Sequence, residues 1–89
     1  MANRRNLKKA VRSISEDLMV ECLAVKQDKP GIAQADIENI AKSILLMENE
    51  YIKRLSHVDK KQTAKFFQLF RDDISTTTNE IVDAIFHLA

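Results

Sequence analysis

Apolar residues recur every three or four positions along most of the chain, which is the spacing of one face of an α-helix. The first such segment, at about residues 3–27, has the apolar stripe Leu7, Val11, Ile14, Leu18, Cys22 and Val25. The second, at about 34–56, has Ile37, Ile40, Ala41, Ile44, Met47, Tyr51 and Leu55. The third, at about 59–88, has Phe67, Phe70, Ile74, Thr77, Ile81, Ala84 and Leu88. The pattern therefore predicts three long helices, each with one apolar face.

Short segments with turn signals separate the three stripes. Pro30 disfavours helix at the residue before it and Gly31 tolerates positive φ, so the first helix is expected to end at about residues 26–28. Asp59 followed by Gln62 has the form of a capping box, which marks the start of the third helix. Long helices joined by short turns predict an all-α, up-down-up three-helix bundle that occupies residues 1–89 as a single domain.

The composition excludes several other classes of protein. Gly and Pro occur once each among 89 residues, too few for the many tight turns of an all-β fold. Cys22 is the single cysteine, so no disulfide forms within the chain and a reducing compartment is favoured. No apolar run is longer than four residues, as at Ile44 to Met47, which is far too short to cross a bilayer. We therefore expect a cytoplasmic protein without a membrane partner.

Three segments resemble a group of known proteins. They are residues 3–9 (NRRNLKK), residues 51–55 (YIKRL) at the end of the second helix, and Lys60-Lys61 at the start of the third. In pattern and charge the chain is similar to small three-helix proteins of unknown function found in Bacteroidetes-type bacteria. The resemblance implies the bundle and a bacterial cytoplasmic setting, and it transfers no functional residue.

Charge is strongly segregated although the formal net charge is only +1. Residues 1–15 contain five bases and no acid, and residues 51–65 contain five bases and one acid. In an up-down-up bundle both basic segments lie at the same end. The candidate anion-binding or partner-binding residues are Arg4, Arg5, Lys8, Lys9, Arg12, Lys53, Arg54, Lys60, Lys61 and Lys65.

Two interpretations of this basic end stay open. Bases in the first turns of helices oppose the macrodipole, at about 0.3 to 1 kcal/mol each, and a broken local rule favours a functional reason such as an anionic partner. That partner is a nucleic acid, a phosphorylated ligand or an acidic protein surface, including another copy. The alternative is a solvated terminus that serves solubility. Nucleic acid is not favoured, because no aromatic residue lies among the bases of the first helix and the second helix is too long for a compact helix-turn-helix.

Several large apolar residues fall outside the three stripes and suggest a contact surface. They are Val20, Leu23, Leu45, Leu46, Leu69 and Phe86. Leu45 and Leu46 lie near the expected level of Val20, so one patch across the first two helices is predicted. Because a core of this size is marginally stable alone, we expect a homodimer formed through Val20, Leu23, Leu45 and Leu46.

Polar residues within the stripes allow further predictions. Glu48 is expected to form a buried ion pair with Arg71. Thr77 and Thr78 are expected opposite Cys22 and Ile40, with hydroxyls bonded to backbone carbonyls one turn earlier. Cys22 is expected to be an inert core thiol.

No motif indicates an enzyme. Glu80, Asp83 and His87 share one face, but that face points away from the core, so a solvated row is predicted rather than a metal site. We expect no catalytic residue, metal or cofactor. The predicted function is a non-enzymatic protein-interaction module with a basic end and an apolar dimer surface. The alternative is a nucleic-acid accessory protein that binds phosphate through the same end.

Overall fold

Three α-helices make up nearly all of the described structure. The computed structural model describes residues 4–57 and 63–88, which contain α1 (Arg4–Asp28), α2 (Gln34–Ser56) and α3 (Thr63–Leu88). No strand occurs in these two ranges. The predicted all-α three-helix architecture is confirmed, and the bounds of α2 agree with those expected from the sequence.

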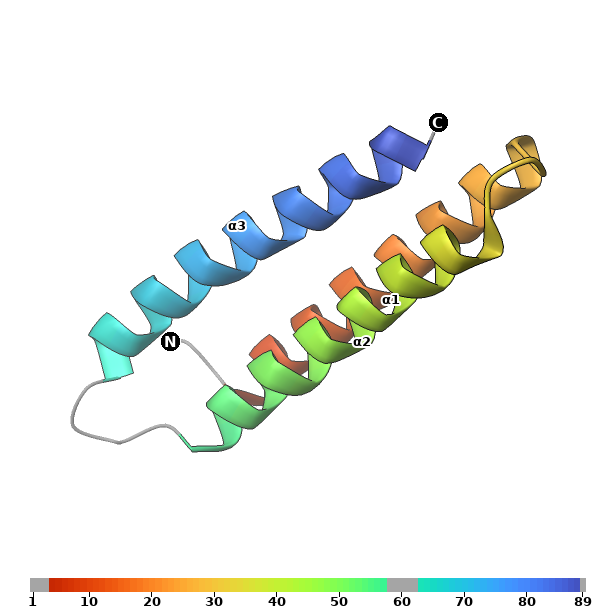
Figure 1. The fold of residues 1–89 in the computed structure, drawn as a ribbon. Coiled ribbons are helices and arrows are strands. Elements are labelled where there is room, and N and C mark those ends of the chain that lie inside the picture. The colour runs from red at the N-terminus through yellow and green to blue at the C-terminus, as the bar shows by residue number, and fades with distance from the viewer. Residues whose placement is uncertain (1–3, 58–62, 89) are drawn as a thin grey trace.

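The helices run up, down and up along the long axis of the molecule. α2 returns beside α1, and α3 then runs in the same direction as α1 (Figure 1). The bundle is elongated, with extents of 51 × 19 × 18 Å. As a result, the start of α1, the end of α2 and the start of α3 lie at one end of the molecule.

The turn between α1 and α2 is determined by Pro30. The N–H of Lys29 still donates to the carbonyl of Val25, at 2.9 Å, as the last bond of the helix. Pro30 follows and has no N–H to continue this pattern. Gly31 does not adopt positive φ, so the turn does not use the conformational freedom expected of this glycine. The capping box predicted at Asp59 and Gln62 lies outside the described residues.

One apolar core joins the three helices, because each contributes one face to it. The buried members follow the expected stripes of α1 and α2 closely, and Ile44 and Leu55 are completely enclosed. The core consists of Val11, Leu18, Cys22, Ile37, Ile40, Ile44, Met47, Tyr51, Leu55, Phe67, Phe70, Ile81 and Ile85.

The stripe of α3 differs from the prediction near its end. Ala84, expected in the core, is exposed, and Ile85 is buried in its place. Positions three and four residues after Ile81 both lie near the apolar face, because a helical turn has 3.6 residues. The larger side chain removes more apolar area from water, so burial of Ile85 is the more favourable arrangement.

Neighbouring positions on α2 provide a test of this core. Ile44→Ala is expected to lower the free energy of unfolding by about 2 to 5 kcal/mol, because it leaves a cavity at a fully enclosed site. Leu45→Ala, the control, should change it by less than about 0.5 kcal/mol, since half of the Leu45 side chain is exposed. Urea unfolding followed by circular dichroism measures both values. Equal losses in the two variants would contradict the assigned core face.

Candidate functional site

The basic side chains predicted to meet at one end of the bundle come from all three helices. Those in the described part of the chain are Arg5, Lys8, Lys9 and Arg12 on α1, Lys53 and Arg54 on α2, and Lys65 on α3. We call this set the basic end. Lys8 is half-buried and the others are exposed. The side chain of Arg4, together with Lys60 and Lys61, lies outside the described residues.

The helix starts at the basic end contain no acidic residue that would balance the macrodipole. The first turn of α1 includes Arg4 and Arg5, and the first turn of α3 includes Lys65. Neither turn contains Asp or Glu. Positive charge at these starts is therefore unfavourable for the helices themselves.

Arg54 is held by contacts with two helices. Its guanidinium contacts Glu50 one turn earlier and Asp73 of α3, both at 3.1 Å. It also lies over the ring of Tyr51, 5.0 Å from the ring centroid. The ion pairs are well exposed, so each stabilises the fold by only about 0.2 to 1 kcal/mol. Arg54 thus joins α2 to α3, and these contacts reduce its availability to a partner.

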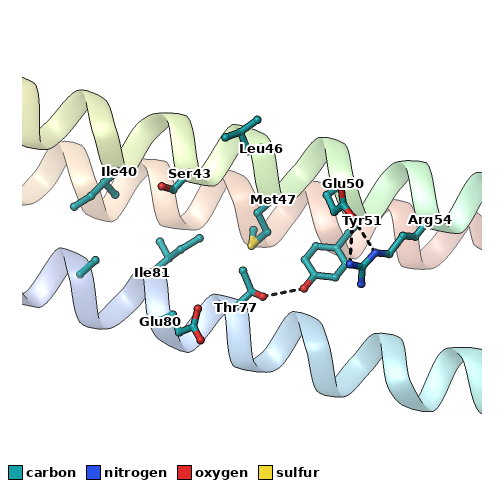
Figure 2. Close-up of a pocket in the computed structure, with 11 residues that line it drawn as sticks. Ile40, Ser43, Leu46, Met47, Glu50, Tyr51, Arg54, Thr77, Glu80 and Ile81 are labelled. Atoms are coloured by element: carbon teal, nitrogen blue, oxygen red, sulfur yellow. Dashed lines mark hydrogen bonds and ion pairs between the residues drawn. The ribbon is translucent and has the colours of Figure 1, made fainter.

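A groove of about 650 Å³ lies between α2 and α3, next to Arg54 (Figure 2). Buried Ile40, Met47 and Ile81 belong to its apolar part, while exposed Leu46 stands at its outer edge on α2. We call this feature the α2–α3 groove. Its lining residues are Ile40, Ser43, Leu46, Met47, Glu50, Tyr51, Arg54, Thr77, Glu80, Ile81 and Ala84.

A hydrogen bond between Tyr51 and Thr77 crosses the α2–α3 groove near Arg54. The two hydroxyl oxygens are 2.8 Å apart (Figure 2). The Tyr51 ring also packs edge-on against Phe70, with centroids 5.3 Å apart. These contacts determine the register of α3 against α2, with residue 77 level with residue 51.

The predicted ion pair between Glu48 and Arg71 is wrong. Glu48 Oε2 instead accepts a hydrogen bond from Ser15 of α1, at 3.1 Å. Because α2 and α3 are antiparallel and residue 51 is level with residue 77, Glu48 is level with about residue 80 of α3. Arg71 lies nine residues before that level, about 13 Å away along the axis of α3. The register of α3 therefore excludes the pair.

Ser15 was missed from the sequence although a signal was present. It lies four residues after Val11 and three before Leu18, within the apolar stripe of α1, and it is buried. A polar group at such a position needs a partner, and Glu48 provides it.

The threonines of α3 also differ from their predicted contacts. Thr77 is opposite Tyr51 rather than Cys22 and Ile40. The hydroxyl that bonds to a carbonyl one turn earlier belongs to Thr76, which donates to Asp72 O at 3.0 Å. Thr78 Oγ1 is buried without a hydrogen-bond partner in the described residues.

The apolar residues outside the stripes are exposed as predicted, and three of them line two different hollows. Val20 and Leu23, at 65% and 59% exposure, line a hollow of about 570 Å³ beside Pro30. Leu46, at 68%, borders the α2–α3 groove instead. Leu45, one residue away, borders neither hollow. Neither of these two hollows is therefore lined by all four predicted dimer residues.

The remaining candidate groups take part in local contacts. His87 Nδ1 lies 2.6 Å from the carbonyl oxygen of Asp83. Within 4–57 and 63–88, no group of three or more His, Cys, Asp or Glu side chains is arranged to hold a metal ion. Cys22 is buried, and this burial raises the pKa of its thiol because the thiolate would lose its hydration.

Two searches for known features gave negative results. None of the helices, over the residues described, combines the length and the apolar character needed to cross a membrane. Comparison with protein-family models, curated proteins and solved structures found no match to this chain. The similarity to three-helix proteins of Bacteroidetes-type bacteria stays a prediction.

The bond between Tyr51 and Thr77 is suited to a double-mutant cycle. Tyr51→Phe is expected to lower the free energy of unfolding by about 0.5 to 1.5 kcal/mol, because it removes one partly buried hydrogen bond. Thr77→Val should cost a similar amount, and the double variant should cost less than the sum of the two. Urea unfolding measures all three variants. Strictly additive losses would show that the two hydroxyls are not coupled.

Proposed function

We propose that this protein is a non-enzymatic interaction module that binds an acidic protein surface through its basic end and contacts a second copy through exposed apolar side chains. The observation that supports it most is the parallel direction of α1 and α3, which brings basic segments distant in sequence to one end of the bundle. Gathered positive charge steers and orients an oppositely charged partner.

The unfavourable position of these charges also supports a role in binding. Bases at the starts of α1 and α3 destabilise their helices, and no acidic residue of either first turn balances them. A negatively charged partner bound at these helix starts would offset the unfavourable interaction between the bases and the helix dipoles. Lys9 and Arg12 are exposed on one side of α1 and are therefore accessible to such a partner.

A nucleic-acid accessory protein is the second candidate function. Lys8 and Arg12 are one turn apart on α1, which suits contact with successive phosphates. The aromatic residues of the neighbouring region do not favour base stacking, because Tyr51 and Phe70 pack against each other and Phe67 is buried. Phosphate contact alone therefore supports this alternative.

Binding of acidic probes tests the proposal. The full chain is titrated into a fluorescently labelled polyglutamate peptide and, separately, a labelled DNA duplex, with anisotropy as the readout. Lys9→Glu together with Arg12→Glu is expected to weaken polyglutamate binding about tenfold or more, because the two reversals remove two exposed cations from the basic end and add two negative charges in their place. The matched control is Lys26→Glu together with Lys29→Glu, which changes net charge equally near the opposite end and should leave the affinity within about twofold.

Each outcome decides between the candidates. Equal weakening by both double variants would show that only net charge matters and would contradict a defined basic end. Absence of polyglutamate binding by the unaltered chain would also overturn the proposal. Tighter binding of DNA than of polyglutamate, lost with Lys9→Glu and Arg12→Glu, would support the nucleic-acid function instead.

A further inference from the structure

On the outer edge of α2, the exposed apolar side chain of Leu46 lies beside the α2–α3 groove. Leu46 is 68% exposed, and Figure 2 shows it directed away from α3 at the edge of the α2–α3 groove. The groove beside it has buried Met47 and Ile81 among its lining and exposed Ala84 on its α3 side. Leu46 and the groove are therefore adjacent parts of one surface, one projecting and one hollow.

Charges of opposite sign flank Leu46 at equal distances along the helix. Lys42 lies four residues before it and Glu50 four residues after it, so the three side chains follow one another at intervals of about one turn. Lys42 and Glu50 are both exposed. Both contacts of Glu50 with Arg54 use Oε1, and the Glu50 side chain is 57% exposed.

We propose that a second copy of this chain docks on this edge, with the two α2 helices antiparallel and the Leu46 side chains of the two copies packed against each other. The inference specifies the self-association part of the proposed function. In a two-fold arrangement centred on Leu46, Lys42 of each copy meets Glu50 of its partner, so the same ion pair forms twice. Contact between the two Leu46 side chains, each 68% exposed in the single chain, also removes apolar area from water.

The charge pattern favours this arrangement over other ways of pairing the two α2 helices. In a parallel pairing at the same level, Lys42 would face Lys42 and Glu50 would face Glu50. An antiparallel pairing displaced by one turn would place Lys42 opposite Arg54 of the other copy. Like charges in contact disfavour both alternatives. Lys42, Leu46 and Glu50 together therefore fix both direction and register.

Two charge-reversal variants test the register directly. Analytical ultracentrifugation of the unaltered full chain over micromolar concentrations is expected to show a dimer. Lys42→Glu alone and Glu50→Lys alone should each weaken the dimer about tenfold, because two attractive pairs become two repulsive pairs. An equimolar mixture of Lys42→Glu and Glu50→Lys should associate again, because both pairs across the mixed dimer have opposite charges.

Matched control variants distinguish the loss of this interface from the general effects of a change in charge or in apolar area. Leu46→Gln is expected to abolish the dimer, whereas Leu45→Gln, which replaces an exposed leucine one residue away, should leave it intact. A monomer at all concentrations, or a mixture no more associated than its two components, would overturn the inference. Polyglutamate binding by the unaltered chain serves as the independent readout: if it persists while the unaltered chain forms no dimer, the second-copy interface fails and the function of the basic end stands.

Discussion

Burial of one apolar stripe from each helix in a shared core is the constraint on which the rest of the structure depends. The stripes run nearly the whole length of each helix, so the helices must lie alongside one another rather than cross. Short connections then require alternating directions for helices adjacent in sequence. α1 and α3 are parallel as a consequence, and this parallel direction determines where every charged segment lies.

The surface follows from the same arrangement. Bases that are separated by about 40 residues along the chain share one end of the bundle, at a cost to the helix starts that carry them. Along the sides, the register set by Tyr51 and Thr77 leaves a groove between α2 and α3, with Leu46 at its edge. One end of the molecule is thus suited to an anionic partner, and the side of α2 is suited to a second copy.

Sequence periodicity was sufficient for the three helices and for most of their buried faces, with Ala84 and Ile85 of α3 as an exception, but not for the register between the helices. The residues that interrupt the stripes, such as Val20 and Leu46, are exposed as the 3.6-residue repeat requires. The Glu48 prediction failed because a repeat along one helix contains no information about the axial position of its neighbour. That position depends on the connection between α2 and α3 and on contacts such as Tyr51 with Thr77. The α2–α3 groove, which this register creates, was not predictable for the same reason.

The direction of α3 relative to α1 is tested most directly by two distances between pairs of spin labels. Electron paramagnetic resonance is measured on Asn6→Cys/Lys65→Cys and on Gln27→Cys/Lys65→Cys, both in a Cys22→Ala background and diluted with unlabelled protein. Residues 6 and 27 are separated by 21 residues of α1, about 32 Å along its axis. A short distance from residue 65 to residue 6 and a long one to residue 27 is the predicted result. The reverse order would mean that the basic segments lie at opposite ends, and it would contradict the account.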